Sequence, residues 1–371
     1  MQQICWMPQT GLSAWAKMSD SPQRILIVRP SAIGDIVMAS AMLKPLNRAW
    51  PDADIDWVVE PAYSPLLEAN PLIEQVVLWD KLKWKELFRK FHLASALREI
   101  RGFAIPLRNA NYDLVLDAQG LLRSRLLAWL SGGKKRIGFE SKEPGRFLMT
   151  RIISRGPCSR MMSSEYHHMI RELGLETKDF KPFIVVGPED NEWANQALQK
   201  KGIKDPYFAI CPFTTRPQKH WFVQSWIKLA ANLAQFYAVD IIVLGGPADR
   251  MTGEKIAEAA GKSIHNFAGK ATLMQSAALL KRSALAIGVD TGLTHMATAF
   301  DVPTIALFGS TRPYLDAGKK STCVVYSHFP CSPCKRRPTC DGRYDCMKWI
   351  TPEMVMDEVK KLILQVPISG N

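Results

Sequence analysis

The stretch Arg24-Ile-Leu-Ile-Val-Arg-Pro-Ser-Ala-Ile-Gly-Asp35 joins a short apolar run to a glycine turn. An apolar run of this length, bounded by turn residues, predicts a buried β-strand that leads into a loop. From Asp35 to Trp50 the apolar residues recur at helical spacing, and Pro51 ends the pattern. A strand, a turn and a helix in this order form the first unit of an alternating α/β fold.

The alternation continues along the rest of the chain. Further apolar runs between helical stretches predict strands at 56–59, 75–78, 113–117, 207–211, 239–244, 285–288 and 304–308. Strands that alternate with helices form a parallel sheet covered on both faces. We therefore expect two doubly wound, Rossmann-like α/β domains, at 24–187 and 188–371, after a weakly structured leader at 1–23. Ligands of such domains bind where the strands end.

Composition excludes several classes of protein. The 371 residues are 47% hydrophobic and 22% charged, as in an ordinary globular protein, and suffice for two or three domains. No window approaches the 18 apolar residues of a spanning helix, so an integral membrane protein is excluded. Residues 1–20 lack the features of a signal peptide, and we expect a cytoplasmic location.

The chain is strongly basic. Its 48 Lys and Arg outnumber 35 Asp and Glu, which leaves a net charge of +13. This excess favours an anionic partner: nucleic acid, a phosphorylated metabolite or an acidic membrane surface. The basic residues follow no recognisable DNA- or RNA-binding motif, so a nucleic-acid-binding protein is kept only as an alternative.

Several familiar site motifs are absent or weak. The chain has no dinucleotide fingerprint, no P-loop and no nucleophile elbow. Asp52-Ala-Asp54-Ile-Asp56 has the D-x-D spacing by which some glycosyltransferases hold a metal, but a polar turn that leads into a strand is the favoured interpretation. For His167-His168 a polar loop or helix face is favoured over a metal site.

Three loops place polar groups just beyond a predicted strand. In the first, Asp35 begins a helix, where a carboxylate is either a cap or an accessible general base. The second carries two hydroxyls and two cations suited to a pyrophosphate, although a solvated basic loop is the alternative. It contains Thr214, Thr215, Arg216 and Lys219. In the third, Gly288–His295, small residues open a helix whose free N–H groups favour phosphate oxygens.

Four stretches in this chain carry a family resemblance. They are Ile25-Leu-Ile-Val-Arg-Pro-Ser-Ala-Ile-Gly-Asp35-Ile, Tyr112-Asp-Leu-Val-Leu-Asp117-Ala-Gln-Gly120-Leu, Thr214-Thr-Arg-Pro-Gln-Lys219-His-Trp221 and Val289-Asp-Thr-Gly-Leu-Thr-His295, the last followed by Pro303-Thr-Ile-Ala-Leu-Phe-Gly309. Together they resemble the bacterial lipopolysaccharide heptosyltransferases, glycosyltransferase family 9. Asp117-Ala-Gln-Gly-Leu-Leu-Arg-Ser124 is most similar to the type I enzymes, which add the first heptose to Kdo.

The resemblance implies a GT-B fold and an inverting, metal-independent transfer with no cofactor. The donor would be ADP-L-glycero-D-manno-heptose, held mainly by the C-terminal domain, and the acceptor Kdo of the inner core, bound by the N-terminal domain. Asp35 matches the general base of the family. The donor-binding residues would be Thr214, Thr215, Lys219, Asp290, Thr291, Gly292 and His295. A type II acceptor or another ADP-sugar is the alternative.

The implied acceptor, Kdo-lipid A, is anionic and lies on the cytosolic face of the inner membrane, which would account for the basic charge. The enzyme would be peripheral on this membrane. Residues 80–91 mix cations with aromatics, as in an interfacial amphipathic segment, or else form an ordinary helix packed on its domain. Candidate acceptor-binding residues are Lys81, Lys83, Arg123, Arg125, Arg136 and Arg146. A solvated surface is the alternative for each arginine.

Four of the eight cysteines crowd into sixteen residues. Cys331, Cys334, Cys340 and Cys346 have C-x2-C-x5-C-x5-C spacing, which could enclose Zn²⁺ or an iron–sulfur cluster. Free thiols, or disulfides formed after lysis, are the alternative. Any metal here is expected to be structural and far from the chemistry. With the net charge, this loop is also what suggests the alternative of a metal-bearing nucleic-acid-binding protein.

Overall fold

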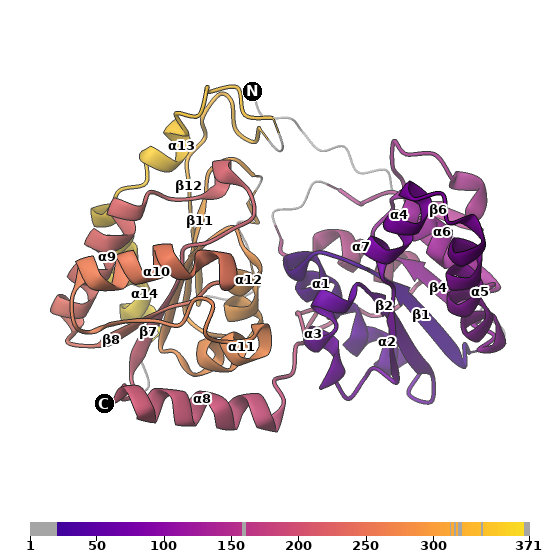
Figure 1. Ribbon diagram of the computed structural model, residues 1–371, viewed down its shortest axis with the longest axis horizontal. Coiled ribbons are helices and arrows are strands. Elements are labelled where there is room, and N and C mark those ends of the chain that lie inside the picture. The colour runs from indigo at the N-terminus through magenta and orange to yellow at the C-terminus, as the bar shows by residue number, and fades with distance from the viewer. Residues whose placement is uncertain are drawn as a thin grey trace. The chain divides into compact units, whose positions relative to one another are not determined.

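The computed structural model describes residues 21–157, 161–311, 313–314, 317, 321–334 and 337–366. These residues form two compact units, coloured indigo to magenta and magenta to yellow in Figure 1. The first contains residues 21–157 and Ser163–Phe183, and the second contains residues 161–162 and the described residues from Ile184 onward. The main division between the units lies at 183/184, whereas the sequence predicted 187/188. Most of the expected leader lies outside the described residues.

The first unit is built on one parallel sheet of six strands, in the order β3-β2-β1-β4-β5-β6. Its central strand, β1, has four fully buried apolar residues, so the sheet is covered on both faces. The strands are β1 (Arg24–Val28), β2 (Asp54–Val59), β3 (Gln75–Leu78), β4 (Leu114–Asp117), β5 (Lys135–Phe139) and β6 (Arg151–Ile153).

Seven α-helices accompany this sheet in the described residues. They are α1 (Ile33–Ala39), α2 (Leu43–Ala49), α3 (Pro65–Glu68), α4 (Lys81–Arg89), α5 (Leu93–Asn109), α6 (Leu122–Leu130) and α7 (Ser164–Glu172). The helix expected from Asp35 is interrupted by a 3-10 turn at Ser40–Met42. The Ser40 hydroxyl donates to the Val37 carbonyl at 2.6 Å and accepts the Phe183 N–H at 2.8 Å. A side chain that binds the backbone in this way competes with regular helical bonding.

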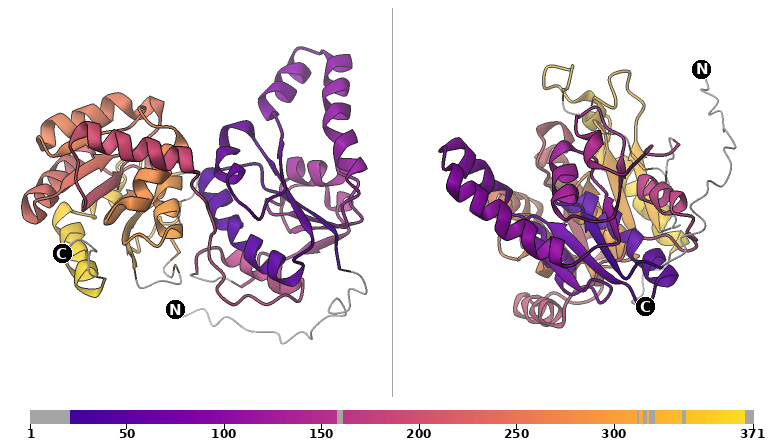
Figure 2. Two further views of the ribbon diagram at one scale, coloured as in Figure 1. Left: turned by 90° about the horizontal axis from the view of Figure 1, so that it is seen from below. Right: turned by 90° about the vertical axis from the view of Figure 1, so that its right-hand side faces the viewer.

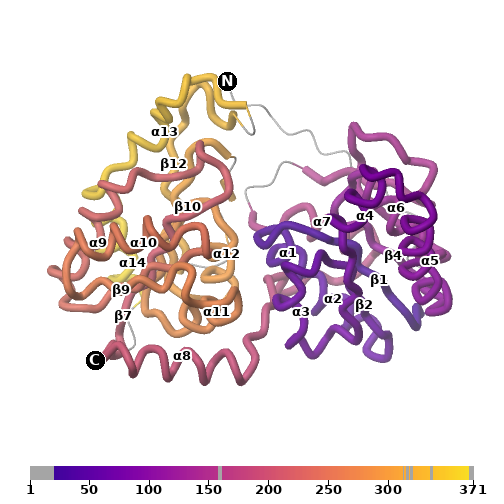
Figure 3. The backbone as a smooth tube through the Cα atoms, in the orientation of Figure 1, coloured from indigo at the N-terminus to yellow at the C-terminus, as the bar shows by residue number. Residues whose placement is uncertain are grey.

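The second unit repeats the design with the strand order β12-β11-β10-β7-β8-β9. Its strands are β7 (Tyr207–Cys211), β8 (Asp240–Val243), β9 (Ile264–Asn266), β10 (Leu285–Val289), β11 (Thr304–Phe308) and β12 (Thr322–Tyr326). Its helices are α8 (Pro188–Lys201), α9 (Val223–Tyr237), α10 (Arg250–Ala260), α11 (Leu273–Arg282), α12 (Gly292–Ala299), α13 (Asp345–Lys348) and α14 (Pro352–Gln365). Figure 3 traces this alternation along the backbone.

The expected fold class is confirmed, since both sheets are parallel and doubly wound. Every strand expected from an apolar run is present. The strands that the sequence did not reveal are β5, β6, β9 and β12, which are short or carry polar residues. Among the described residues, no helix has the length and apolar character needed to cross a membrane.

The D-x-D stretch is part of the first sheet. Asp54 begins β2, and Asp56 is fully buried, where it accepts the Tyr112 hydroxyl at 2.5 Å and an Arg24 N–H at 3.4 Å. Its carboxylate is therefore a core anchor, and the favoured interpretation of this segment holds. His167 and His168 lie on α7, so of the two favoured interpretations the helix is the one present.

Candidate functional site

The predicted donor residues of the second unit gather around one carboxylate. Asp290 follows β10 directly, and its Oδ2 lies 2.6 Å from Lys219 Nζ. The Thr311 hydroxyl donates to the same oxygen at 2.5 Å. His295 Nε2 lies 3.3 Å from Oδ1, and the Thr214 hydroxyl donates to the Asp290 carbonyl at 3.3 Å. Loops after β7, β10 and β11 thus meet at this point, which we call the Asp290 cluster.

The partners of Asp290 keep it ionised although it is buried. Burial alone would raise the pKa of this carboxyl, but His295 and Lys219, through hydrogen bonds and charge, lower the pKa well below its usual range. An anionic ligand would compete with Asp290 for Lys219 and so weaken this buried ion pair.

Close packing of α12 on β10 shapes the cluster. A Cβ at Gly288 would lie 2.1 Å from Thr294 Oγ1, so only glycine allows the helix to approach. Thr294 donates to the Val289 carbonyl at 2.7 Å, which fixes the first turn. Thr291 occupies the N-cap position, but its hydroxyl accepts no hydrogen bond from the first turn of α12. The N–H groups of Gly292 and its neighbours therefore have no side-chain cap. Such N–H groups attract phosphate oxygens.

His295 is buried and held from both sides of its ring. Nδ1 lies 3.1 Å from the Tyr314 hydroxyl, while Nε2 faces Asp290. Burial raises the pKa of Tyr314 above its ordinary value, so this hydroxyl stays protonated. Tyr314 and Thr311 are members of the cluster that the sequence did not single out. Their position in the sequence could have identified them, because they lie in the loop after the apolar run Thr304–Phe308, the third strand that ends at the Asp290 cluster.

The loop after β7 is ordered by its own contacts. His220 Nε2 lies 2.7 Å from the Thr214 carbonyl, and Pro217–Lys219 form a 3-10 turn that carries the lysine toward Asp290. Thr215 is exposed at the surface of this loop. Its side chain is therefore open to a ligand but does not belong to the Asp290 cluster.

The cysteine-rich loop packs onto the turn that supports Asp290. Ser332 donates to the Gly309 carbonyl, and the Cys334 thiol lies 3.8 Å from the Ser310 carbonyl. The Cys346 sulfur would lie 2.9 Å from a Cβ at Gly309. Thr311, next along the turn, donates to Asp290, so this loop packs one residue away from a member of the Asp290 cluster.

The predicted metal at this loop is not supported. Cys331, Cys334, Cys340 and Cys346 are all free thiols. Throughout the described part of the chain, no group of three or more His, Cys, Asp or Glu side chains is placed to hold a metal ion. A structural metal at this loop is therefore not shown, and no step of the reaction is assigned to a metal.

Asp35 lies in the first turn of α1, in the first unit. Its Oδ2 is 2.7 Å from Arg29 Nη2 and 3.4 Å from the Ala32 N–H. The carboxylate therefore serves in part as a cap, as one of the two interpretations expected. Its side chain remains 43% exposed, so an acceptor hydroxyl has access to it.

A buried arginine fixes this carboxylate. Arg29 directly follows β1, and its Nη1 donates to the Ala118 carbonyl at 2.8 Å. Burial alone would lower the pKa of Arg29, but Tyr166, Asp35 and Glu165 raise it above the ordinary value. The guanidinium thus remains charged in the interior. The signal that could have found it was a cation at the end of an apolar strand.

The Asp117–Gly120 stretch builds the turn that receives Arg29. Asp117 Oδ1 accepts the N–H groups of Gln119 at 3.0 Å and Gly120 at 2.9 Å. Gly120 has φ +72°, and a Cβ there would lie 2.9 Å from Arg155 Nη2. Burial raises the pKa of Asp117. This motif therefore orders the loop and leaves no carboxylate oxygen facing solvent.

The candidate acceptor residues differ widely in their surroundings. Arg125 is buried and donates to the carbonyls of Phe139 (2.9 Å), Glu143 (2.9 Å) and Pro144 (3.0 Å). Arg125 therefore holds this loop together, and we do not carry it forward as an acceptor residue.

Arg136 is also occupied, by the carbonyls of Leu148 (2.8 Å) and Gly133 (2.6 Å). Arg123 is half-buried and Arg146 is exposed. Lys81 pairs with Glu60 at 3.3 Å, and Lys83 pairs with Glu99 at 2.7 Å. Of the six candidates, the exposed or half-buried Arg123, Arg146, Lys81 and Lys83 remain accessible to an acceptor.

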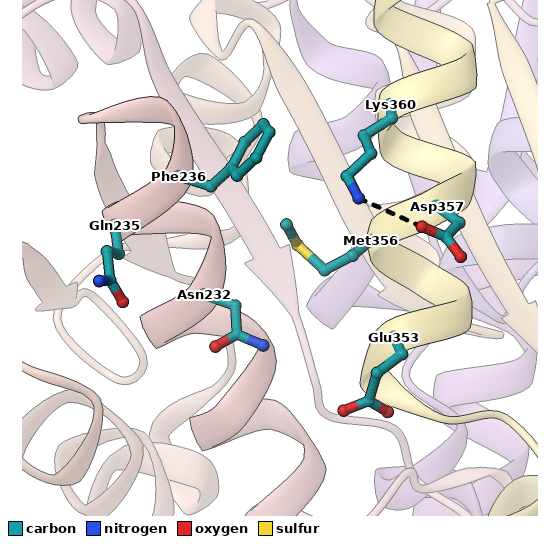
Figure 4. Close-up of a pocket in the computed structure, with 7 residues that line it drawn as sticks. All are labelled: Asn232, Gln235, Phe236, Glu353, Met356, Asp357 and Lys360. Atoms are coloured by element: carbon teal, nitrogen blue, oxygen red, sulfur yellow. Dashed lines mark hydrogen bonds and ion pairs between the residues drawn. The ribbon is translucent and has the colours of Figure 1, made fainter.

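A hollow lies between α9 and α14 of the second unit (Figure 4). Asn232, Gln235, Phe236, Glu353, Met356, Asp357 and Lys360 line it. Lys360 is paired with Asp357 at 3.3 Å and lies 5.5 Å from the Phe236 ring centroid. Its lining comes from two surface helices and includes none of the candidate site residues.

Comparisons with known proteins agree with this fold. The family model described as glycosyltransferase family 9 (heptosyltransferase) matches residues 100–344. Lipopolysaccharide heptosyltransferase 1 of Pseudomonas aeruginosa is 28% identical over 92% of this chain and 98% of its own. Lipooligosaccharide heptosyltransferase 2 of Haemophilus influenzae is 25% identical over 91% of this chain and 99% of its own.

Solved structures show the same fold. A family 9 glycosyl transferase from Veillonella parvula has a TM-score of 0.77 at 20% identity and covers 92% of this chain and 97% of its own. E. coli heptosyltransferase WaaC with ADP-2-deoxy-2-fluoro heptose has a TM-score of 0.70 at 24% identity and covers 91% and 99%.

Two Rossmann-like units, each with a parallel sheet, and the solved structures define a GT-B fold, and the family model defines a glycosyltransferase. Because the family model covers more than half of its length, the chain belongs to glycosyltransferase family 9, the heptosyltransferases.

Proposed function

We propose that this enzyme transfers heptose from ADP-L-glycero-D-manno-heptose to Kdo of the lipopolysaccharide inner core, with inversion at the anomeric carbon. The observation that carries the proposal is the Asp290 cluster, in which a lysine, two threonines and a histidine converge beside the N-terminus of α12. Relatives matched over almost their entire length are lipopolysaccharide heptosyltransferases, and this supports the same donor and acceptor class here.

The donor's diphosphate would bind at this cluster. Lys219 supplies the cation, and the N–H groups at the start of α12 supply donors without charge. Thr214 and exposed Thr215 add hydroxyls beside the lysine. Asp290, held in a fixed orientation, is suited to accept hydrogen bonds from hydroxyl groups of the sugar. As the bond to the sugar breaks, the lysine would stabilise the charge on departing ADP.

Asp35 would act as the general base. The acceptor hydroxyl oxygen attacks the anomeric carbon while its proton passes to the Asp35 carboxylate. The bond between that carbon and the phosphate oxygen breaks, and ADP leaves with the electron pair. Attack from the face opposite ADP inverts the configuration. Arg29 keeps the carboxylate in place throughout, because its guanidinium is buried and bonded on both sides.

Acceptor anions would be bound by the basic side chains that remain accessible in the first unit. These are Lys81, Lys83, Arg123 and Arg146. Kdo-lipid A carries carboxylate and phosphate groups, and the net charge of +13 suits such a partner. An acceptor with lipid chains also places the reaction at a membrane, with the enzyme peripheral on the cytosolic face of the inner membrane.

A transfer assay followed by mass spectrometry tests the proposal. Wild-type enzyme, ADP-heptose and Kdo-lipid A should yield an acceptor heavier by one heptose, with or without a chelator. ADP-glucose and ADP-mannose as competing donors test the sugar. A heptosylated Kdo-lipid A offered as acceptor distinguishes a type II activity. Salt-dependent binding of duplex nucleic acid that ADP leaves unchanged, together with no transfer, would contradict the proposal.

A further inference from the structure

Helices α4 and α5 form a hairpin that projects from the first unit, as the left view of Figure 2 shows. Its inner side is packed in the ordinary way. Trp84 meets Trp79 and Phe103 edge to face, with ring centroids 6.0 and 5.6 Å apart. Ala104 and Leu107 of α5 are buried nearby. The hairpin therefore has a conventional anchor, and its far end needs a separate explanation.

Large apolar side chains are exposed at that far end. Phe88 at the end of α4, Phe91 in the connection, and Leu93 and Leu97 at the start of α5 are about half exposed or more. We call these four the hairpin tip. Phe91 is 83% exposed and has φ +54°, a conformation that bulky residues rarely adopt. A group of exposed apolar side chains at one end of a hairpin, unlike a single one, is typical of an interaction surface.

Cations surround the hairpin tip. Residues 81–101 contain seven Lys and Arg and two Glu, a net charge of +5. The two glutamates are already paired, Glu86 with Lys90 at 2.6 Å and Glu99 with Lys83 at 2.7 Å. Four of the five excess charges are on the exposed Lys85, Arg89, Arg98 and Arg101, and the fifth, Lys81, pairs with Glu60.

We propose that the hairpin tip inserts into the surface of an anionic lipid membrane. Apolar side chains bordered by cations are the pattern of a segment that lies in the interface between headgroups and acyl chains. A nucleic acid would match the cations but leave the aliphatic side chains in water. A second copy of this surface would bring two positive patches together. An anionic bilayer satisfies both the charge and the apolar area.

The position of the hairpin connects membrane binding with catalysis, and this connection rests on the proposed function. Lys81, at the start of α4, pairs with Glu60, whose N–H donates to the Pro30 carbonyl in the loop that leads to Asp35. The hairpin therefore begins at the carboxyl end of the strands, where the proposed base also lies. Insertion of the tip would hold this end of the sheet beside a membrane in which the lipid-anchored acceptor lies.

Flotation of the full chain with vesicles tests the proposal. Wild type should bind vesicles of phosphatidylethanolamine and phosphatidylglycerol and bind pure phosphatidylcholine much more weakly. The triple variant Phe88→Ser, Phe91→Ser, Leu97→Ser should lose affinity for the anionic vesicles by about tenfold or more, because apolar insertion is removed. Lys85→Gln with Arg89→Gln should weaken binding and reduce its salt dependence.

The matched control is Met251→Ser with Leu364→Ser, which removes two apolar side chains of the second unit that are as exposed as those of the tip. This control should bind vesicles like wild type. If the control loses as much affinity as the triple variant, or if wild type fails to bind anionic vesicles, the proposal is wrong. A dimer seen by sedimentation velocity that the triple variant abolishes would also overturn it, since the tip would then be a protein interface.

Transfer to a water-soluble Kdo acceptor without acyl chains separates this proposal from the proposed function. The triple variant should retain the wild-type rate with that acceptor and lose rate only with Kdo-lipid A in vesicles. Vesicle binding through the tip without any heptose transfer would mean that the docking surface stands while the proposed reaction fails. Transfer without vesicle binding would mean the reverse.

Discussion

Lys219 Nζ lies 2.6 Å from Asp290 Oδ2, so the cation that would neutralise the donor's diphosphate is already paired with a buried carboxylate. The two residues come from loops after neighbouring strands, β7 and β10. A diphosphate that approaches must therefore draw the lysine from an existing partner. Asp290 would then still have its contacts with His295 and Thr311, so the carboxylate would not be left without hydrogen-bond partners.

Substitution of the lysine should weaken donor binding as well as turnover. We expect Lys219→Met to bind ADP about 10 to 100 times more weakly, the value of one charge-assisted hydrogen bond. Titration calorimetry with ADP measures this directly. Lys219→Arg, which keeps the charge, should retain more affinity. Equal affinity of Lys219→Met and wild type would contradict the diphosphate role.

Acid stability should reveal the same pair. The pKa of folded Asp290 is lowered, so its stabilising effect is complete above the pKa of an ordinary carboxyl, about 4, and is lost as the pH falls below it. Loss of the lysine raises the folded pKa, and Lys219→Met should therefore unfold in acid at a higher pH than wild type. Circular dichroism between pH 7 and pH 2 checks this. Lys270→Met, which breaks an ion pair on the same unit, is the control.

Removal of the proposed base should spare the donor site. Asp35→Asn is expected to lower kcat by about 10²- to 10⁴-fold, the usual contribution of a general base, while ADP affinity stays at the wild-type value. Single-turnover transfer and ADP calorimetry measure the two separately. Wild-type turnover in Asp35→Asn would show that the carboxylate is only a helix cap.

Arg29 should act through Asp35 as a positioning residue. Arg29→Met removes the 2.7 Å contact, so kcat should fall at least tenfold while the KM for ADP-heptose changes little. Arg29→Lys keeps a cation and should restore part of kcat. Because Arg29 is buried, thermal melting identifies any loss of fold. Melting at the wild-type temperature with unchanged kcat would refute the positioning role.

The cysteine-rich loop should show graded thiol reactivity. Burial and the neighbouring Cys331, Cys334 and Cys340 raise the pKa of Cys346 to about 11, so at pH 7.5 it is a protonated, inert thiol. We expect iodoacetamide to label half-buried Cys331 well before Cys346 or buried Cys340. Peptide mass spectrometry over time measures this order. Rapid labelling of Cys346 in the folded chain would contradict the packing against Gly309.

Apolar runs predicted the fold well because the central strands of a doubly wound sheet are buried on both faces. Strands such as β1 and β7 leave an uninterrupted apolar signal. The strands that were missed, for example β9 with Ile-His-Asn, are only partly enclosed and carry polar side chains. Periodicity has little to detect where a strand is short, as in β6 and β9, or begins with charged residues, as in β5.

The candidate sites divide along the same line. Residues just beyond a central strand, such as Asp290 and Asp35, were predicted because strand ends are located by the strands themselves. Thr311 and Tyr314 were missed, since their role depends on which loop folds over which, a tertiary contact with no local pattern. Arg125 resembled a surface cation in sequence and is instead enclosed by three carbonyls.

The burial of Arg29 has a consequence for timing. Its guanidinium is enclosed by the sheet and the turn at Ala118, so the counter-ion of Asp35 is installed when the chain folds and does not leave during a catalytic cycle. The counter-ion of Asp290 is Lys219, and a bound donor would break this ion pair, which would re-form at the end of every turnover. In the proposed reaction the ion pair of Asp35 would therefore stay intact through every turnover, whereas that of Asp290 would break and re-form each time.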